Sequence, residues 1–320
     1  MDIVLHLSKE HPELPKAEVS AVLEGEGIGY KFSEDYMQIG LLIATIDSDN
    51  ADFINRLALT KSAGELVHIA DNLPEIASMV SEKISGDTFA VRSESKTIEE
   101  ELGRLIWEMG HKVDLITPDT KILCFKEDGK YVIAIDVPLT KEFEKRKPKR
   151  KPFFHPTGMK PKLARLMVNL GRVKARDVIF DPFCGTGSIL IEAGLMDIKV
   201  KGLDINSKIV DGCKENLKFY GIRGRIRVGD ILDITSHGRV DAIVTDPPYG
   251  RSSFVTDRNL ENLYRGFISS AAEILSEEKY LVMSLPDEFR IESDEFDIIE
   301  KYSWYVHKSL TRQIYVLERV

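Results

Sequence analysis

A regular alternation of apolar strand-like runs and amphipathic helices in the second half of the chain restricts its fold more than any other feature. The strand-like runs are residues 178–180, 200–204, 226–229, 241–245 and 280–285. Strands that are connected through helices run parallel and form a sheet with helices on both faces. Two final runs, residues 298–306 and 313–317, are too close together for a helical crossover. We therefore expect an α/β, doubly wound sheet that ends in an antiparallel edge hairpin.

The first 140 residues have a less regular pattern, which is typical of a smaller α+β region. The expected strands are residues 3–7, 30–32, 38–46, 65–69, 88–92, 121–126 and 131–137, and the expected helices are residues 16–23, 50–59, 73–84 and 97–109. Thr97-Ile-Glu-Glu100 has the composition of a helix N-cap. We place one segment at residues 1–46 and a second domain at residues 47–140.

A strongly basic segment, residues 141–151, separates the two halves. It holds seven Lys and Arg against two Asp and Glu, whereas residues 1–140 hold 13 against 26 and the whole chain has a net charge of −8. Affinity for phosphate comes from Lys and Arg, so the acidic total excludes an indiscriminate binder of nucleic acid. The basic segment is either a solvated linker or a contact for phosphate, and we treat residues 141–158 as an interdomain linker.

The composition favours a soluble globular protein, because 43% of the residues are hydrophobic and 30% are charged. No apolar run approaches the roughly 18 residues that cross a bilayer, and the N-terminal residues do not have the pattern of a signal peptide. Cys124, Cys184 and Cys213 lack the close spacing of zinc ligands or of a disulfide framework. We expect a cytoplasmic protein with reduced thiols, no metal and no membrane partner.

The segment Ile179–Gly194 has the form of a strand, a glycine-containing turn and a helix. Gly185 and Gly187 allow the backbone to turn tightly and to approach a ligand, and the helix start offers unpaired N–H groups. A phosphate-binding Gly-x-x-x-x-Gly-Lys-Ser/Thr loop is absent, and Leu190 stands where a dinucleotide-binding turn needs its third glycine. The sequence therefore favours S-adenosylmethionine, which has an adenosine and no pyrophosphate.

Aspartates follow four successive strands of the expected sheet, namely Asp181, Asp204, Asp230 and Asp246. Because parallel strands end at the same edge, these carboxylates should share one crevice. Asp204 has the separation from the glycine turn that suits hydrogen bonds to ribose hydroxyls, and Asp230 could accept from an adenine amino group. The expected cofactor contacts in and after these strands are Asp181, Pro182, Phe183, Cys184, Gly185, Thr186, Gly187, Asp204, Ile205, Asp230, Ile231 and Asp246.

Asp246-Pro-Pro-Tyr249 resembles the catalytic motif of methyltransferases that act on the exocyclic amino groups of nucleobases. The nitrogen of such a group is a poor nucleophile, because its lone pair is delocalised into the ring. Hydrogen bonds to the Asp246 carboxylate and the Pro247 carbonyl would favour a pyramidal nitrogen that points at the methyl group. The prolines fix the turn, and Tyr249 can stack on the base. The expected catalytic residues are Asp246, Pro247, Pro248 and Tyr249, without metal or covalent intermediate.

The N-terminal half resembles a THUMP domain at residues 89–93, 101–104 and 112–118. Together with the catalytic motifs, nearly the whole chain resembles the archaeal tRNA (guanine-10-N2) methyltransferase family. The resemblance implies a ferredoxin-like segment at residues 1–46, a THUMP domain at 47–140 that grips the acceptor end of tRNA, and a Rossmann-like methyltransferase domain at 159–320. It also implies that N2 of guanine 10 receives one or two methyl groups.

The same resemblance adds residues to the expected site. His155 and Thr157 belong to a stretch that packs over the cofactor in the relatives, so both are expected cofactor neighbours. The expected RNA-binding residues are Arg92, Lys96, Arg104, Lys145, Arg146, Lys147, Lys149, Arg150 and Lys151. Because residues 1–140 are acidic overall, the basic side chains of that half would have to gather on one face.

Other functions stay open at this point. The same Asp-Pro-Pro-Tyr chemistry serves adenine-N6 methylation of DNA or RNA, and guanine-N2 methylation at another RNA position. From a different class, the chain could be a THUMP-containing RNA-binding protein without activity, which the intact Asp246 and glycine turn disfavour. We expect a monomer, with tRNA as its partner and S-adenosylmethionine as its cofactor.

Overall fold

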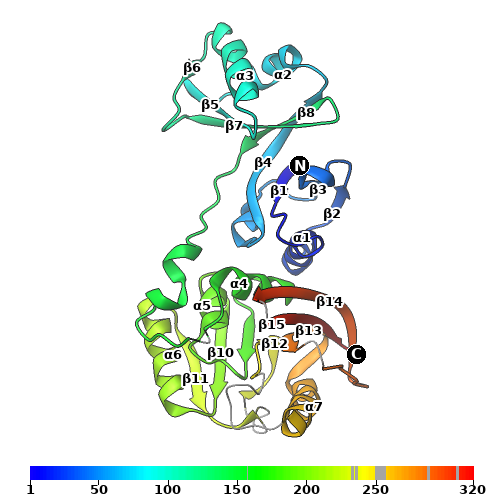
Figure 1. The fold of residues 1–320 in the computed structure, drawn as a ribbon, viewed down its shortest axis with the longest axis vertical. Coiled ribbons are helices and arrows are strands. Elements are labelled where there is room, and N and C mark those ends of the chain that lie inside the picture. The colour runs from blue at the N-terminus through cyan, green and yellow to red at the C-terminus, as the bar shows by residue number, and fades with distance from the viewer. Residues whose placement is uncertain (157, 232–233, 235–236, 249–256, 287–288, 308–309) are drawn as a thin grey trace. The chain divides into compact units, whose positions relative to one another are not determined.

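The computed structural model of the 320-residue chain describes all residues except 157, 232–233, 235–236, 249–256, 287–288 and 308–309. The chain forms two compact units that are not continuous in sequence (Figure 1). The first unit consists of Met1–Glu10, Ile28–Asn55 and Thr60–Thr140, and the second of His11–Gly27, Arg56–Leu59 and Lys141–Val320. The second unit therefore takes two segments from the N-terminal part of the chain.

An eight-stranded sheet forms the first unit, in the order β2-β3-β1-β4-β8-β7-β5-β6. The strands are β1 (Asp2–Leu7), β2 (Tyr30–Ser33), β3 (Leu41–Ile46), β4 (Thr60–Ala70), β5 (Thr88–Arg92), β6 (Lys112–Val113), β7 (Thr120–Glu127) and β8 (Lys130–Asp136). The helices α2 (Leu73–Ser81) and α3 (Lys96–Glu108) cover a core that includes Ile76, Phe89 and Leu102. Because β4 pairs with β1 on one side and β8 on the other, a single sheet contains strands from before and after residue 46.

Several expected elements of the first half differ in the structure. The expected helix at residues 50–59 is only a 3-10 helix, η2 (Asp52–Arg56), because the amides of Ala58 and Leu59 donate to the Glu18 carboxylate instead of to helical carbonyls. The strand expected to begin at residue 38 is preceded by a 3-10 helix, η1 (Met37–Ile39). Ser95, not Thr97, is the N-cap residue of α3.

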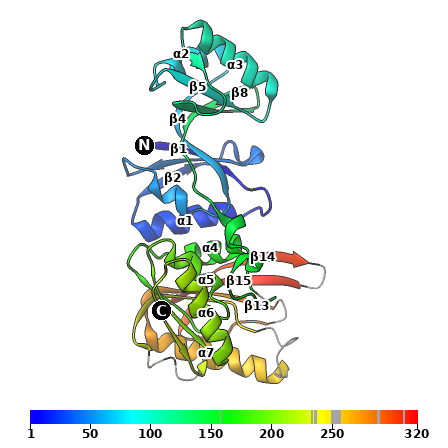
Figure 2. The ribbon, with the colours of Figure 1, turned by 90° about the vertical axis from the view of Figure 1, so that its left-hand side faces the viewer.

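The second unit contains a seven-stranded sheet in the order β11-β10-β9-β12-β13-β15-β14. The strands are β9 (Val178–Asp181), β10 (Lys199–Asp204), β11 (Gly224–Val228), β12 (Val240–Thr245), β13 (Leu275–Pro286), β14 (Phe296–His307) and β15 (Leu310–Arg319). The first five in this order run parallel, and β15 is antiparallel to both β13 and β14. Figure 2 shows the β14–β15 hairpin projecting at the edge of the sheet, so the expected sheet and edge hairpin are confirmed.

Both faces of this sheet are covered by helices. Alternate residues of a strand point to opposite faces, and Ile179 of β9 accordingly lies in one core whereas Phe180 lies in the other. The first core contains side chains of α4 (Pro161–Leu170), α5 (Ser188–Gly194) and α6 (Ser207–Phe219), and the second contains side chains of α7 (Asp257–Ile274). The carboxyl edge of the parallel strands is where a ligand site is expected.

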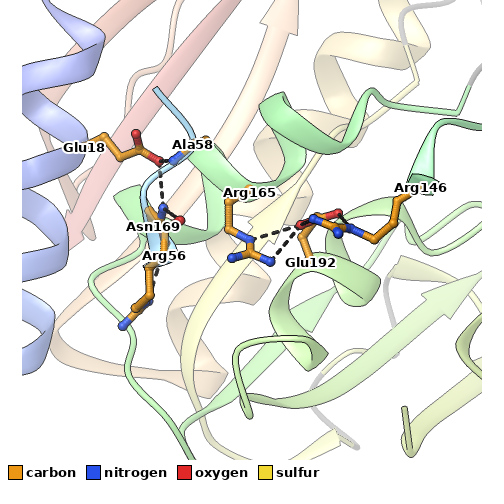
Figure 3. Close-up of polar contacts among 7 residues, drawn as sticks. All are labelled: Glu18, Arg56, Ala58, Arg146, Arg165, Asn169 and Glu192. Atoms are coloured by element: carbon orange, nitrogen blue, oxygen red, sulfur yellow. Dashed lines mark hydrogen bonds and ion pairs between the residues drawn. The ribbon is translucent and has the colours of Figure 1, made fainter. Parts of the chain in front are cut away.

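The helix α1 (Leu14–Glu26) packs in the second unit although it lies near the N-terminus. Glu18 is fully buried, and its carboxylate accepts the N–H group of Leu59 at 2.8 Å. It also accepts the N–H group of Ala58 and the Asn169 amide of α4, each at 2.7 Å (Figure 3). Burial raises the pKa of Glu18, and the three hydrogen bonds oppose that rise. Hydrogen bonding of buried polar groups explains why these distant segments meet.

The basic segment belongs to the second unit and is partly helical. It contains the 3-10 helices η3 (Phe143–Arg146) and η4 (Pro148–Arg150), so residues 141–158 do not form a separate linker between compact units. Among the described residues, no helix combines the length and apolar character that a membrane span requires. No group of three His, Cys, Asp or Glu side chains in the same residues is arranged to hold a metal ion.

Candidate active site

Acidic side chains gather at the carboxyl edge of the second sheet. Asp181 and Asp204 end the neighbouring strands β9 and β10, and Asp246 directly follows β12 on the other side of β9. Asp230 follows β11 and is exposed. The negative charges of Asp246 and Asp204 both act on Asp181, since each raises its pKa. The edge therefore brings the four predicted aspartates to one side of the sheet, and Asp204 and Asp246 both lie within electrostatic reach of Asp181.

The Asp181 side chain points into the protein and is 2% exposed. Its Oδ1 atom accepts the hydroxyl of Thr245 at 2.7 Å and the N–H of Phe183 at 3.2 Å. Burial raises the pKa of Asp181 to about 7, and the neighbouring carboxylates add to this rise while the hydrogen bonds oppose it. The hydrogen bond with Thr245 joins the end of β9 to the end of β12, and Thr245 directly precedes Asp246. Asp181 is thus placed to position Asp246 from inside the protein.

The glycine turn after β9 has the backbone geometry that its residues suggested. Gly185 and Gly187 have φ angles of 49° and 81°, a region that favours glycine. A Cβ atom at Gly187 would lie 2.8 Å from the Cys213 sulfur, so the close approach of α6 also requires glycine there. The N–H of Gly187 donates to the Cys184 carbonyl at 2.8 Å, which closes the turn before α5 begins at Ser188.

Asp204 holds the loop on the other side of this turn. Its two carboxylate oxygens accept the N–H of Gly185 at 3.1 Å and of Asn206 at 2.9 Å, and the residue remains partly exposed. The neighbouring Ile205 side chain is 75% exposed, which is unusual for an isoleucine. The partly exposed Asp204 carboxylate suits the ribose hydroxyls of an adenosine. The exposed Ile205 side chain suits its ring face, and Asp230 suits its amino group. These residues therefore fit S-adenosylmethionine.

The remaining expected cofactor neighbours form two groups, one partly exposed to solvent and one buried. Phe183, Gly185 and His155 are partly exposed, and Phe183 packs edge-on against Phe267 of α7 with ring centroids 5.6 Å apart. Those whose side chains or backbone are buried are Pro182, Cys184, Thr186, Gly187 and Ile231. Thr157 lies outside the described residues.

Asp246 and the two prolines form the turn that follows β12. Asp246 Oδ2 forms an ion pair with Arg312 Nη2 at 2.9 Å, and the two side chains are only 17% and 12% exposed. The carbonyl of Pro248 accepts the hydroxyl of Tyr264, a buried residue of α7. Burial, with the nearby Asp246 charge, raises the pKa of Tyr264, so this hydroxyl stays protonated as a donor. Tyr249 lies outside the described residues.

Arg312 and Tyr264 were not expected from the sequence. Neither belongs to a motif, and both are distant from Asp246 along the chain. Arg312 reaches the site because β15 is antiparallel and begins at the edge where β12 and β13 end. The only available signal was the expected edge hairpin, which places the first residues of its second strand at that edge but does not name one.

Comparisons with known proteins agree with this geometry. The family described as RMKL-like methyltransferase domain matches residues 148–314, and a family described as DNA methylase matches residues 18–215, a range that stops before Asp246. A tRNA (guanine(10)-N2)-dimethyltransferase from Methanothermobacter thermautotrophicus is 41% identical over 100% of both chains. The chain belongs to the tRNA (guanine-10-N2) methyltransferase family. The Pyrococcus abyssi member of this family is 36% identical over 96% of both chains.

Structural comparison supports the methyltransferase fold of this family member. The crystal structure of TrmN from Thermus thermophilus matches with a TM-score of 0.58 and 17% identity over 100% of both chains. At this identity the likeness concerns the fold alone. The expected family and the expected Rossmann-like methyltransferase sheet are both confirmed.

Two of the expected RNA contacts are wrong, because Arg146 and Lys151 are buried in the second unit. Arg146 donates through Nε and Nη2 to the two carboxylate oxygens of Glu192 at 2.7 and 3.1 Å. Lys151 Nζ donates to the Ser188 hydroxyl at 2.7 Å, and burial lowers the pKa of Lys151 to about 8. The buried Glu192 needs cations beside it, and the basic segment supplies one of them.

The other expected RNA contacts lie on the surface in various settings. Four side chains of the basic segment are exposed, namely those of Lys145, Lys147, Lys149 and Arg150. In the first unit, Lys96 and Arg104 form ion pairs with glutamates four residues ahead in α3, at 3.5 and 2.6 Å. Arg92 donates to the carbonyls of Val91 and Leu115. Their contact with RNA stays a prediction.

Proposed function

We propose that this protein is an S-adenosylmethionine-dependent methyltransferase that modifies N2 of guanine 10 in tRNA, in the cytoplasm and as a monomer. The observation that carries the proposal is the placement of Asp246 and its two prolines. They lie at the carboxyl edge of the sheet, next to the glycine turn and Asp204. The activities named for relatives of 41% and 36% identity support the choice of guanine N2.

The chemistry follows from what Asp246 and Pro247 can accept. The guanine amino nitrogen is a weak nucleophile because its lone pair is delocalised into the ring. The Asp246 carboxylate and the Pro247 carbonyl accept its two hydrogens, which favours a pyramidal nitrogen and stabilises the positive charge that develops on it. S-adenosylmethionine, when bound, would supply an electrophilic methyl group. The bond from its sulfur to the methyl would break as the bond to N2 forms, S-adenosylhomocysteine would leave, and the proton that N2 loses would pass to the Asp246 carboxylate. Transfer then depends on position and electrostatics.

Three contacts keep this turn in place for the reaction. Arg312 holds the Asp246 carboxylate, Tyr264 holds the Pro248 carbonyl, and the hydroxyl of Thr245 donates to Asp181 inside the sheet edge. A turn held by its own side chains needs little reorganisation when a base enters, which is the condition for electrostatic catalysis. We also assign Asp204 to the ribose hydroxyls and Asp230 to the adenine amino group.

Binding of tRNA is assigned to both units. In the second, the exposed cations Lys145, Lys147, Lys149 and Arg150 can contact phosphates. In the first, the resemblance to a THUMP domain supports a grip on the acceptor end of tRNA. Holding the tRNA at one point would set the distance to the modified guanine by geometry.

The test uses two tRNA transcripts that differ only in the exocyclic amino group of the base at position 10. Inosine lacks the exocyclic N2 of guanine, so a transcript with inosine at position 10 removes the acceptor and leaves the rest of the tRNA unchanged. Nucleosides from each transcript, after incubation with enzyme and S-adenosylmethionine, are separated by mass spectrometry. We expect methylguanosine from the guanine-10 transcript alone, and the time course distinguishes one methyl group from two.

The enzyme side of this test uses Asp246→Asn and Asp246→Ala. Both should lower transfer by at least about 100-fold, since each removes the charge that stabilises the transition state. Cofactor affinity, measured by calorimetry, should change little. Equal methylation of the inosine-10 transcript, or near-normal turnover by Asp246→Ala, would contradict the proposed function.

A further inference from the structure

Arg312 lies near the start of β15, on the far side of β13 from the strand that carries Asp246 at its end. The sheet register places Arg312 opposite Pro286 of β13 and Trp304 of β14. Pro286 ends β13, and β13 runs parallel to β12. Arg312 is therefore at the carboxyl edge, and its long side chain reaches across the end of β13 to the carboxylate.

The ion pair between Arg312 and Asp246 is largely shielded from water. The Nη2–Oδ2 distance is 2.9 Å, and the exposed fractions of the two side chains are 12% and 17%. Exposed ion pairs hold their partners weakly, whereas partly buried guanidinium–carboxylate pairs have fixed geometry and stronger interaction. The direction of the Asp246 side chain is thus tied to β15.

Charge gives this contact a second consequence. Among the described residues, Asp181 of β9, Tyr264 of α7 and Arg312 of β15 lie within electrostatic reach of Asp246. Nearby carboxylates disfavour one another's ionised forms, as the effect of Asp246 on Asp181 already shows. The guanidinium opposes this repulsion at the carboxylate that has to accept hydrogens from the base.

We propose that Arg312 is a positioning residue for the methyl transfer: its guanidinium orients the Asp246 carboxylate that accepts hydrogens from the base. This inference rests on the proposed function of Asp246. It assigns to the edge hairpin a role in the active site, in addition to closing the sheet. A residue that only stabilised the hairpin would change the stability of the protein without a specific loss of kcat.

The experiment compares wild type with Arg312→Met and Arg312→Lys. For Arg312→Met we expect kcat to fall by roughly 100-fold, as for other small misplacements of reacting groups, with the KM for S-adenosylmethionine little changed. Arg312→Lys should restore part of kcat, since it keeps the charge.

The matched control is Arg319→Met, at the opposite end of the same strand. Arg319 donates to the carbonyls of Ala272 and Glu295 and is remote from Asp246 in the register. We expect this change to lower the unfolding temperature and to leave kcat nearly unchanged. If Arg312→Met and Arg319→Met behave alike, with similar losses of stability and of kcat, Arg312 has only a structural role.

The kinetic outcomes separate this inference from the proposed function. Methylation of guanine 10 by wild type, with a loss of kcat in Arg312→Met that Arg312→Lys partly restores, supports the inference. Methylation by wild type with an unchanged kcat in Arg312→Met overturns it. Failure of wild type to methylate guanine 10 would instead overturn the proposed function.

Discussion

Asp181 illustrates how burial changes the behaviour of an acidic residue at the end of a strand. Its folded pKa is raised to about 7 from 3.8, so the folded protein binds this proton more tightly than the unfolded chain does. The resulting stabilisation is complete below about pH 4 and is lost as the pH rises through about 7. We expect the free energy of unfolding to decrease across this window by up to roughly 1.4 kcal/mol per pH unit.

The measurement is chemical unfolding of wild type and Asp181→Asn at pH 5, 6, 7 and 8. Asparagine keeps an oxygen for the Thr245 hydroxyl but cannot ionise, so the difference between the two proteins isolates the titration of Asp181. The stability of wild type relative to the variant should fall with rising pH. A difference that stays constant from pH 5 to 8 would show that Asp181 does not titrate in this range.

Asp204 is expected to determine cofactor affinity. In Asp204→Ala the ribose hydroxyls would lose their acceptor, and the N–H groups of Gly185 and Asn206 would lose theirs. Hydrogen bonds to a charged group contribute about 1.5–3 kcal/mol, so the Kd for S-adenosylmethionine should rise by roughly 10- to 100-fold in calorimetry. Asp211→Ala, which removes a largely exposed carboxylate from α6, is the control and should leave Kd unchanged.

At the scale of elements, a buried charge cluster ties the basic segment to two helices. Glu192 of α5 lies between Arg146 of η3 and Arg165 of α4, with both arginines donating to its carboxylate (Figure 3). Burial lowers the pKa of Arg165, and the Glu192 charge opposes that change. Because α5 begins directly after the glycine turn, this cluster also fixes the helix that follows that turn.

Glu192→Ala should therefore be strongly destabilising, because it leaves two buried guanidinium groups without a counter-charge. Loss of one partner from a buried pair costs about 3–5 kcal/mol, which urea unfolding would measure as a lower midpoint. Glu144→Ala, whose side chain is exposed and pairs with Lys147 on the surface, should cost less than about 1 kcal/mol. Similar losses for the two variants would mean that the cluster contributes no more than a surface pair.

At the scale of the whole molecule, the catalytic unit is built from three separate stretches of sequence. Glu18→Ala would leave the N–H groups of Ala58, Leu59 and Asn169 without their buried acceptor. Each buried unpaired donor costs about 1–3 kcal/mol, so we expect a loss of roughly 3 kcal/mol or more. This loss of stability should appear as faster proteolysis within residues 141–320, which are far along the chain from the substitution. Glu65→Ala, on an exposed position of β4, should leave that cleavage rate unchanged.

The charge distribution of the whole molecule gives a prediction for tRNA binding. Gln substitution of the exposed Lys145, Lys147, Lys149 and Arg150 should weaken binding and flatten its salt dependence. The slope of log K for tRNA binding against log salt concentration should change by up to about 0.9 for each phosphate that the variant no longer neutralises. The control replaces four exposed lysines elsewhere in the same unit, namely Lys174, Lys199, Lys214 and Lys218. Equal slopes for the two variants would show that the basic segment has a purely structural role.

Much of the fold followed from patterns that are short in sequence. Strand and helix periodicity predicted the parallel sheet and its edge hairpin, because each element is encoded in a few neighbouring residues. The same holds for the glycine turn, for Asp204 and for Asp246, which follow directly from strand ends. The helix expected at residues 50–59 failed because its amides bond to Glu18, a residue about 40 positions earlier.

The sequence by itself determined the glycine turn, the aspartates at the strand ends and the edge of the sheet at which they gather. Only the tertiary structure decided that α1 joins the catalytic unit, that Arg146 and Lys151 are buried, and that Arg312 holds Asp246. The contacts of Glu18 with Asn169, Arg146 with Glu192 and Arg312 with Asp246 join residues 151, 46 and 66 positions apart. Their cause is the pairing of buried polar groups across packed elements, which depends on how those elements come together and leaves no periodic trace in the sequence.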